Sequence, residues 1–574
     1  MKYGFFKVAA VSPKLRVADV KYNTEKIIEA IDDAVRQHVE LLVFPEKCIT
    51  GATVGDLCGQ RILENGIKTA LTEIEKSTVG RDIIVVLSFP SCEKRGAAEF
   101  VGIENGRTVA VGNGRRGMLI ESERIPGLSV AVCTAAMLNR IPSKASIVAC
   151  VDAKPELAGR AELKETVIKA ESIRQRSAVI YANAGSGESS TDFVYGGRKL
   201  IYEAGRLLAK SGAFGDEMII TDIDLERLCV RIDISGTDDF KLSRRIPQNP
   251  FLPSDASKKR ERLAEILEIQ AHGLLRRMEH IGCKTAVIGI SGGLDSTLAL
   301  LVTRRAYELA GLGTDGIVAV TMPAFGTSGR TYENALEIMK QTGVTAREIN
   351  IKEAVLQHLS DIGHNPENKN AAYENAQARE RTQVLMDIAN DVNGIVVGTG
   401  DLSELALGFA TYNGDHMSMY GVNASVPKTL VRELVGFVAE SEKNEKLKNA
   451  LLSVCDTPIS PELLPTREDG SIAQCTEDIV GPYELHDFFI YHIIKYGFSP
   501  SKILFTAVNA FEGKYDETTV KHWLSVFLKR FFSQQFKRSC LPDGVAVGSI
   551  GLSPREGFKM PSDAVAKLWL EDIE

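Results

Sequence analysis

The sequence of 574 residues contains no apolar run that approaches the roughly 20 residues needed to span a bilayer. Charged residues interrupt the opening stretch MKYGFFKVAAVSPKLRVADV, so it lacks the pattern of a secretory signal. The ten cysteines are scattered, without a CxxC pair or the spacing of zinc ligands, and they do not indicate an oxidising compartment. These absences predict a reduced, cytoplasmic protein with no membrane partner.

An excess of basic residues is also absent, because 68 Lys and Arg face 75 Asp and Glu and the formal net charge is −7. That balance argues against a protein dedicated to binding nucleic acid. Hydrophobic residues make up 44% and charged residues 25% of the chain, as in an ordinary globular protein. The length predicts two or three domains, and no internal repeat is visible.

The first part of the chain, residues 1–243, alternates strand-like and helix-like segments. The strand-like segments are FFKVAAVSP, VELLVFPE, DIIVVLSFP, LSVAVCTA, ASIVACV and AVIYANA, and VKYNTEKIIEAIDDAVRQH has the helical pattern. Residues 244–259 are rich in proline and polar residues, which predicts a linker.

The second part, residues 260–574, begins with a helical stretch that ends near His280. The strand-like segments GIVAVTMP, AREINI and GIVVGTG then alternate with helical patterns up to about Glu440. This alternation predicts a doubly wound parallel sheet, so the chain is expected to be an α/β protein. The rest of the sequence predicts a C-terminal extension of helices and loops.

A glycine-rich turn joins strand to helix in AVIGISGGLDSTLALL, residues 286–301. Backbone N–H groups from Ser291 to Ser296 can surround an anion at the helix N-terminus, although a purely structural turn is the alternative for the loop alone. The Lys of the pattern G-x-x-x-x-G-K-[ST] is missing, so neutralisation of phosphate falls to Mg²⁺, with Asp295 as an oxygen ligand. This combination favours attack on an α-phosphate with pyrophosphate as the leaving group.

Four further blocks keep their order around this loop: ENAQARERTQVLMDIAN, VVGTGDLSELALGFATYNGD, NASVPKTLVREL and RFFSQQFKRSCLPDG. With them the chain resembles the NAD⁺ synthetases, a group of pyrophosphatase-loop ATP enzymes, in their long glutamine-dependent form. The resemblance implies a Rossmann-like domain that adenylates deamido-NAD⁺ with ATP, releases AMP and pyrophosphate, and admits ammonia. It also implies a homo-oligomer with paired synthetase domains.

The same resemblance assigns residues to each substrate. The residues expected to bind ATP are Gly289, Ile290, Ser291, Gly292, Gly293, Leu294, Asp295, Ser296 and Thr399. Those expected to bind deamido-NAD⁺ are Asn375, Glu404, Phe409, Ala410, Thr411, Tyr412 and Lys537. Asp295 and Glu404 are expected to hold Mg²⁺, which would steady charge on the phosphates.

The front domain resembles the nitrilase amidases, which implies an α-β-β-α sandwich that frees ammonia from glutamine. That chemistry needs a Cys nucleophile, a Glu general base and a Lys that stabilises the charged intermediate. LLVFPEKCITG supplies Glu46, LSVAVCTAAM supplies Cys133, and the block from Asn183 to Glu217 matches a later part of the family.

Several features of this amidase pattern are missing. The segment that carries the family's Lys is absent before the Cys133 strand, where Arg115 and Arg116 are the only nearby cations. Thr134 and Ala135 replace an acidic pair. A glutamine-contacting Ser is replaced by Lys154, and Arg160 fills the other contacting position. The sequence therefore predicts weakened or lost glutaminase activity.

Three hypotheses remain open at this stage. The first is a glutamine-dependent NAD⁺ synthetase, and the second is the same synthetase with a non-catalytic front domain that uses free ammonia. The third is another amidating or tRNA-modifying enzyme of the same loop superfamily, against which the acidic balance argues.

Overall fold

The computed structural model describes residues 3–91, 97–114, 116–141, 145–156, 160–185, 187–190, 195–228, 240–325, 329–458, 476–555 and 557–574. The chain divides into two compact units, Met1–Arg245 and Ile246–Glu574. No helix of the described residues is long and apolar enough to cross a bilayer.

The first unit contains two six-stranded sheets, in the orders β12-β1-β2-β3-β4-β5 and β11-β10-β9-β8-β7-β6. The strands are β1 (Phe5–Ala10), β2 (Leu41–Val43), β3 (Ile84–Pro90), β4 (Ala98–Glu104), β5 (Arg107–Asn113), β6 (Met118–Glu121), β7 (Ser129–Cys133), β8 (Ile147–Asp152), β9 (Ala178–Asn183), β10 (Lys199–Glu203), β11 (Arg206–Lys210) and β12 (Ile219–Asp224). Three helices cover them: α1 (Val20–Arg36), α2 (Arg61–Ser77) and α3 (Arg160–Gln175).

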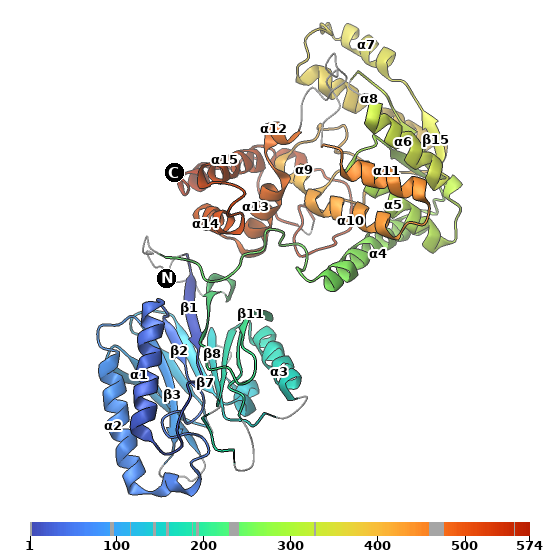
Figure 1. The fold of residues 1–574 in the computed structure, drawn as a ribbon. Helices are drawn as coiled ribbons and strands as arrows, with labels where there is room; N and C mark the ends of the chain where they lie inside the picture. Colours follow the sequence, from blue (N-terminus) through green and yellow to red (C-terminus); the bar gives the residue numbers. More distant parts are fainter. Residues whose placement is uncertain are drawn as a thin grey trace. The chain divides into compact units, whose positions relative to one another are not determined.

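Apolar residues fill both faces of each central sheet, which is why these strands read as nearly continuous hydrophobic runs. One core lies between the two sheets and includes Val8, Val86 and Ala149. A second core packs the first sheet against α1 and α2, and a third packs the second sheet against α3 (Figure 1). The four layers are helix, sheet, sheet and helix, so the expected α-β-β-α sandwich is confirmed.

Strands β5 and β11, at the margins of the two sheets, were not evident from hydrophobicity, because they are largely exposed. The β4–β5 hairpin turns at Asn105 and Gly106, whose φ angles of 47° and 79° are those of a tight hairpin turn. An Asn-Gly pair between two strands is a strong sequence signal for this turn, because both positions need positive φ. Ala204 and Gly205 form the corresponding turn between β10 and β11, with φ angles of 45° and 86°.

The second unit contains a five-stranded sheet in the order β15-β14-β13-β16-β17, with every neighbouring pair parallel. The strands are β13 (Ala286–Gly289), β14 (Ile317–Thr321), β15 (Thr345–Glu348), β16 (Ile395–Gly398) and β17 (Tyr420–Gly421). Strand order reverses between β13 and β16, and in such sheets ligands bind outside the carboxyl ends of the strands at that point. The expected doubly wound sheet is confirmed.

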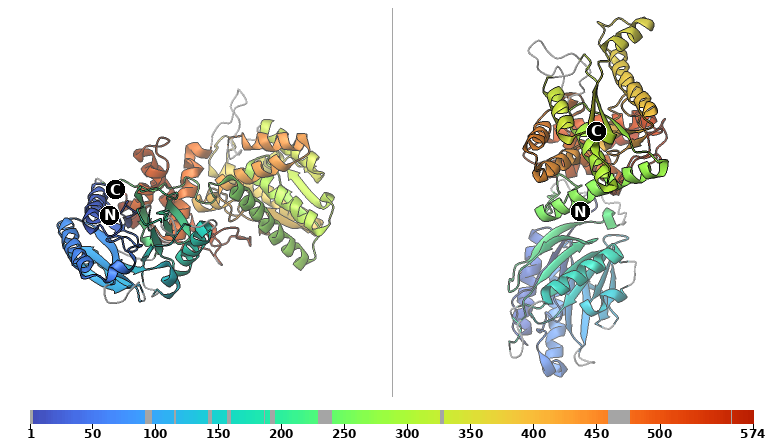
Figure 2. Two further views of the ribbon diagram at one scale, coloured as in Figure 1. Left: turned by 60° about the horizontal axis from the view of Figure 1, so that its bottom comes forward. Right: turned by 90° about the vertical axis from the view of Figure 1, so that its right-hand side faces the viewer.

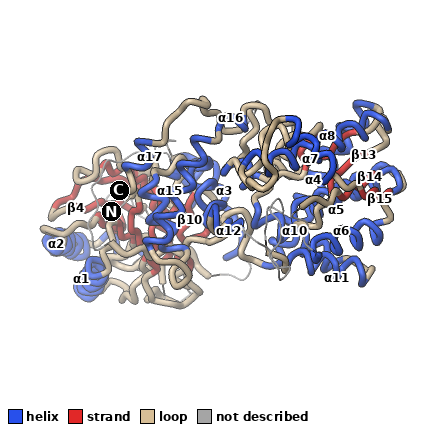
Figure 3. Tube along the Cα trace, turned by 90° about the horizontal axis from the view of Figure 1, so that it is seen from above, coloured by secondary structure: helices blue, strands red, loops and turns tan. Residues whose placement is uncertain are grey.

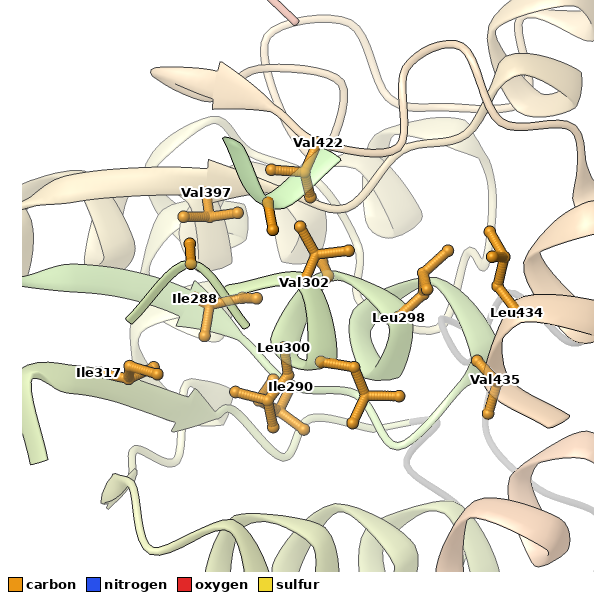
Figure 4. Close-up of a cluster of buried hydrophobic side chains, with 14 of the residues drawn as sticks. Ile288, Ile290, Leu298, Leu300, Val302, Ile317, Val397, Val422, Leu434 and Val435 are labelled. Atoms are coloured by element: carbon orange, nitrogen blue, oxygen red, sulfur yellow. The ribbon is translucent and has the colours of Figure 1, made fainter. Parts of the chain in front are cut away.

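Helices cover both faces of this sheet (Figures 2 and 3). One face carries α4 (Ala256–Ile281), α5 (Leu294–Ala310), α6 (Gly329–Thr342), α10 (Lys428–Ser441) and α11 (Glu445–Cys455), and the other carries α7 (Lys352–Asp361) and α8 (Ala371–Asp391). Figure 4 shows Ile288 of β13, Leu298 and Val302 of α5, and Leu434 of α10 in one buried cluster. This core fixes the strand, the glycine-rich turn and α5 as one rigid element.

The remaining helices are α9 (Leu402–Leu407), α12 (Thr476–Val480), α13 (Tyr483–Tyr496), α14 (Pro500–Ala510), α15 (Glu517–Ser533), α16 (Gln535–Arg538) and α17 (Lys567–Glu571). All of them except α16 contribute to a separate C-terminal apolar cluster. This arrangement confirms the predicted helical extension for the described residues.

The helix α4 begins at Ala256, four residues earlier than the sequence indicated. Asp255 accepts a hydrogen bond from the backbone N–H of Lys258 at 2.9 Å, which caps the helix. The predicted linker therefore ends within this cap rather than at Lys259. At its other end, Arg244 is buried in the first unit, where it pairs with Glu203 at 2.8 Å.

His486 in α13 predicts an acid-sensitive step in stability. Its Nε2 lies 2.5 Å from the carbonyl of Val480, Nδ1 has no partner among the described residues, and burial lowers its pKa to about 4. Because the unfolded chain binds a proton near pH 6.5 and the folded chain does not, stability falls as the pH drops between these values. Relative to His486→Gln, which keeps a donor but does not titrate, we expect a loss of about 2 kcal/mol between pH 7.5 and pH 5.

Urea unfolding followed by tryptophan fluorescence measures this difference. Of the two tryptophans, Trp523 packs against the C-terminal apolar cluster, and the ring of Trp569 lies 4.7 Å from that of Phe532 in the cluster, so the signal comes from the relevant region. Equal pH dependence of the two proteins would show that folding does not lower the pKa of His486.

Candidate active site

The glycine-rich turn lies at the reversal point of the sheet, directly after β13. Gly292 has a φ angle of +85°, and a Cβ atom there would collide with the backbone carbonyl of Thr331. Only glycine fits that position without strain. Ser291 Oγ accepts the N–H of Gly293 at 3.2 Å and lies 3.1 Å from Ser296 Oγ, which ties the turn to α5. The N-terminus of α5 therefore presents its free N–H groups toward the expected ATP site.

Alanine substitutions test this backbone geometry. Gly292→Ala is expected to lower the free energy of unfolding by about 1–3 kcal/mol, because it forces a left-handed conformation and a backbone collision. Gly293→Ala is the matched control, because the nearest atom to its new Cβ is Ser291 Oγ at 3.4 Å and its φ angle is −90°. Urea unfolding compares the two variants, and equal stabilities would contradict the role given to Gly292.

Three carboxylates and one ammonium meet beside this turn. Lys428 Nζ lies 2.7 Å from Asp295 Oδ2, 2.7 Å from Asp401 Oδ2 and 2.9 Å from Glu404 Oε1. One oxygen of each carboxylate lies within 4.8 Å of the others, which is a spacing that can hold a metal ion. The structure thus brings together Asp295 and Glu404, the two residues expected to bind Mg²⁺.

Burial and charge act in opposite directions in this cluster. Burial raises the pKa of Glu404 to about 7, although the Lys428 ammonium lowers it. Burial also raises the pKa of Asp401 well above its ordinary range. Burial lowers the pKa of Lys428, but the three carboxylates outweigh it and raise that pKa well above its ordinary value. Lys428 therefore stays charged, and the carboxylates are crowded enough to favour a further cation.

Hydrogen bonds from the amide side chains of Asn423 and Gln270 connect the carboxylate cluster to neighbouring loops. Asn423 Nδ2 donates to the carbonyl of Asp295 at 3.0 Å and to the carbonyl of Thr399 at 3.1 Å. Gln270 of α4 donates in turn to Asn423 Oδ1 at 3.0 Å. These bonds place Thr399, at the carboxyl end of β16, next to the glycine-rich turn. The residues expected to bind ATP therefore come from two neighbouring strand ends.

The residues expected to bind deamido-NAD⁺ gather around the turn that follows α9. Thr411 Oγ1 donates to Asn375 Oδ1 at 2.8 Å. Lys537 Nζ donates to the carbonyls of Gly408 and Ala410, each at 2.7 Å. Burial lowers the pKa of Lys537. Two of its three donors thus stabilise the turn, which leaves one for a ligand.

Tyr412 adds an aromatic surface to this group. Its ring stacks on His416 with centroids 5.0 Å apart and lies 5.4 Å from Phe536. The Tyr412 side chain is exposed, so it is available for contact with a substrate ring. Phe409 is tied to α9 by a backbone hydrogen bond from its N–H to the carbonyl of Glu404 at 2.9 Å.

In the first unit, Glu46 lies just beyond β2 among charged neighbours. Its N–H donates to the carbonyl of Asp152 at 3.3 Å, and its Oε1 lies 3.8 Å from Lys47 Nζ. Burial raises the pKa of Glu46, as suits a general base. Asp152, at the end of β8, pairs with Lys164 Nζ at 2.8 Å.

Cys133 stands at the end of β7, where the resemblance requires it, but its side chain is only 1% exposed. It packs in an apolar cluster with Leu138, Ile168 and Tyr181, on the face of the sheet that α3 covers. Cys150 is its register partner in β8, and burial together with the Cys133 thiol raises the pKa of Cys150. Among the described residues no hydrogen bond joins Cys133 to Glu46.

The connection between the two sheets of the first unit is short. Strand β5 ends at Asn113 and β6 begins at Met118, and Asn113 pairs with Gly117 across the turn. The connection is therefore too short to contain the segment that carries the amidase lysine. Arg116 and Lys154 are exposed, and Arg160 is exposed at the start of α3. Arg115 lies outside the described residues.

Two members of the carboxylate cluster, Asp401 and Lys428, were not singled out from the sequence. Asp401 accepts the N–H of Glu404 at 2.7 Å as the cap of α9, so the pattern Asp-x-x-Glu is also a helix-start signal. Lys428 directly follows a proline at the start of α10 and would ordinarily be solvated. Only the fold shows that three acidic side chains surround it.

Comparisons with known proteins show which families the two parts of the chain resemble. Residues 266–446 match the family model described as NAD synthase, and residues 7–119 match the model described as Carbon-nitrogen hydrolase. The glutamine-dependent NAD(+) synthetase of Mycobacterium bovis is 33% identical over 668 residues, which cover 100% of this chain and 98% of the relative. The corresponding protein of Mycobacterium leprae is 33% identical over 666 residues, with the same coverage.

More distant matches include two further glutamine-dependent NAD(+) synthetases. The glutamine-dependent NAD(+) synthetase of Acinetobacter baylyi is 24% identical over 533 residues and covers 87% of this chain and 90% of its own. A crystal structure of the glutamine-dependent NAD(+) synthetase from Cytophaga hutchinsonii has a TM-score of 0.45 and 18% identity, and covers 99% of this chain and 100% of that one.

The fold and the site define a two-unit ligase, with a nitrilase-like sandwich followed by a doubly wound sheet that carries an ATP-type glycine loop. Over its full length the chain is 33% identical to a glutamine-dependent NAD(+) synthetase, which identifies the family within this class. The chain belongs to the family of glutamine-dependent NAD⁺ synthetases.

Proposed function

We propose that this protein amidates deamido-NAD⁺ to NAD⁺ through an adenylated intermediate, with AMP and pyrophosphate as products. The observation that carries the proposal is the cluster of Asp295, Asp401, Glu404 and Lys428 at the start of α5, beside a glycine turn without a lysine. Such a loop suits a departing pyrophosphate, because its N–H groups hold an anion that is not transferred.

The donor set of the cluster fits Mg²⁺. Three carboxylates and one ammonium leave two negative charges in excess when all four are ionised, and Asp295 Oδ1 is buried without a hydrogen-bond partner among the described residues. Asp295 and Glu404 would hold the ion, since carboxylate oxygens are its preferred protein ligands. When bound, Mg²⁺ supplies charge neutralisation for the phosphates of ATP.

The protein side chains supply binding and orientation. The Ser291–Ser296 turn holds the β- and γ-phosphates, and Lys428 keeps the carboxylates at a fixed spacing near the α-phosphate. The Phe409–Tyr412 turn, stiffened by Lys537 and Asn375, is assigned to deamido-NAD⁺. Holding two reactants in one geometry is a large part of the catalysis of such a transfer.

The front unit is assigned to the nitrogen donor. Glu46 and Cys133 occupy the amidase positions, but their present geometry favours free ammonia as the effective donor. We also assign a homo-oligomeric state in which synthetase units pair, on the strength of the family resemblance. Size-exclusion chromatography with light scattering measures that state, and a monomer at micromolar concentration would contradict it.

A substrate panel tests the proposed function. The protein is incubated with ATP, Mg²⁺ and ammonium chloride, together with deamido-NAD⁺, xanthosine monophosphate or tRNA. NAD⁺ formation confined to the first mixture is expected. Amidation of the purine nucleotide or of tRNA, without NAD⁺ formation, would move the chain to another branch of the loop superfamily.

A further inference from the structure

Helix α10, which begins at Lys428, has no side-chain cap of its own. The residue before its first turn is Pro427, which makes no side-chain cap bond. The first N–H groups of a helix have no partner within it, so neighbouring elements must supply the acceptors. Ser403 Oγ of α9 accepts the N–H of Lys428 at 2.8 Å. Asp487 Oδ2 of α13 accepts the N–H of Thr429 at 2.9 Å, so two other helices set the position of this first turn.

Asp487 joins the starts of α9 and α10 through both of its carboxylate oxygens. Its Oδ1 accepts the hydroxyl of Ser403, the second residue of α9. Its Oδ2 accepts the hydroxyl of Thr429 at 2.6 Å as well as the N–H of that residue. The residue is only 1% exposed, so water does not compete for these bonds. Three helices therefore meet at one buried carboxylate.

The Asp487 carboxylate is largely ionised at neutral pH although it is buried. Burial raises the pKa of Asp487 to about 6, while its hydrogen bonds with Ser403 and Thr429 and the Lys428 ammonium lower it. A negative charge beside the N-terminus of a helix is favourable, because the helix dipole is positive there. Asp487 thus gives α10 the acidic cap that Pro427 does not supply.

The hydrogen bonds of Asp487 end one residue away from the carboxylate cluster. Ser403 directly precedes Glu404 in α9, and its hydroxyl also holds the backbone of Lys428. Glu404 Oε1 lies 2.9 Å from Lys428 Nζ within the cluster. No hydrogen bond or ion pair joins Asp487 itself to the side chains of the cluster in the described part of the chain. Its effect on the cluster therefore passes through the backbones of α9 and α10.

We propose that Asp487 is a positioning residue, which holds Glu404 and Lys428 at the spacing that Mg²⁺ and the phosphates of ATP require. The proposal rests on the proposed function and adds to it a residue that lies outside the site. Side chains that orient metal ligands without touching the metal commonly change metal affinity or activity when they are replaced. A misplacement of about 1 Å far from the reacting atoms can itself slow a reaction about a hundredfold.

Asp487→Asn tests the proposal, because it keeps the shape of the side chain but replaces one acceptor oxygen by an NH₂ group. The turnover number with ATP, Mg²⁺, deamido-NAD⁺ and ammonium chloride is expected to fall about tenfold. In calorimetric titrations of the free protein with Mg²⁺ and ATP, without the dinucleotide, the dissociation constant is expected to rise by about the same factor.

A double-variant comparison distinguishes positioning from a general loss of stability. Ser403→Ala breaks the same series of hydrogen bonds between Asp487 and Lys428, so it is expected to lower turnover and affinity as Asp487→Asn does. Because both substitutions act through one series of bonds, the double variant is expected to lose little more than the more affected single variant. If Asp487→Asn does not fold, Ser403→Ala decides alone.

The control is His486→Gln, the neighbouring position in α13. His486 is equally buried, but it contacts Val480 and stacks on Phe527. Its turnover and its affinity for ATP with Mg²⁺ are expected to match the wild type, even where urea unfolding shows a change in stability. If the wild type forms no NAD⁺, the proposed function fails, while calorimetry still reports on Asp487. Wild-type turnover and affinity in Asp487→Asn or in Ser403→Ala, or effects of the two that multiply, would overturn the positioning role.

Discussion

Asp295→Asn and Glu404→Gln are each expected to lower ammonia-dependent NAD⁺ formation at least about a hundredfold. Each change keeps the shape of the side chain but removes a charged oxygen from the cluster around Lys428. Groups of this kind act on charge that develops in the transition state, and removal of one commonly costs about 3–4 kcal/mol. Turnover is measured with saturating ATP, Mg²⁺ and ammonium chloride.

The control is Glu308→Gln, near the other end of α5, where the side chain is exposed and pairs only with neighbouring arginines. It is expected to keep wild-type turnover, since surface pairs contribute little. Tryptophan fluorescence checks that each variant is folded. Wild-type turnover in Asp295→Asn or in Glu404→Gln would show that the cluster stabilises the fold and does not serve the reaction.

Ammonia is expected to support NAD⁺ formation several hundred times better than glutamine. A nucleophile, its base and its stabilising cation act as a unit, so a centre that lacks one member loses most of its rate. In this chain the Cys133 thiol is buried in an apolar cluster, and Glu46 makes no hydrogen bond to it among the described residues. Loss of a preorganised charge donor by itself accounts for about 3–4 kcal/mol, a factor of several hundred in rate.

Two of the cations near this centre already have acidic partners. Lys164 is paired with Asp152 at 2.8 Å, and Lys47 lies 3.8 Å from the carboxylate of Glu46. Neither reaches Cys133 through any contact of the described residues.

The variants Cys133→Ala and Cys150→Ala distinguish an active glutaminase centre from an inactive one. Both variants are expected to keep ammonia-dependent activity at the wild-type level. The decisive assay supplies glutamine in ammonia-free buffer. Strong wild-type activity that disappears in Cys133→Ala but persists in Cys150→Ala would show that a rearranged centre works, with Lys47 or Lys164 as its cation.

The layered folds could be predicted because most residues of the central strands are apolar. Strands such as β5 and β11 escaped prediction because they lie at sheet margins and expose alternate or consecutive side chains. Their turns were nevertheless readable, since Asn105-Gly106 demands positive φ at both positions. At these hairpins the turn residues therefore predict the structure better than the hydrophobic pattern of the strands does.

The site residues also divide into those that could be predicted from the sequence and those whose surroundings depend on the fold. The glycine turn could be located from sequence, because its chemistry is local and Gly292 must adopt a left-handed conformation. Lys428 could not, because its surroundings depend on carboxylates from two segments, Asp295 and the Asp401–Glu404 turn, that are far apart in the chain. The position of Cys133 at a strand end was also predictable, whereas the face to which it points depends on how α3 packs.

The adenylated intermediate is tested most directly with deamido-NAD⁺ that carries ¹⁸O in its nicotinate carboxylate. If a carboxylate oxygen attacks the α-phosphate, that oxygen leaves with AMP when ammonia displaces it. Phosphorus NMR of the products is expected to show one ¹⁸O in AMP for each NAD⁺ formed, with equimolar unlabelled pyrophosphate. ADP with labelled inorganic phosphate, or AMP without the label, would contradict the proposed reaction.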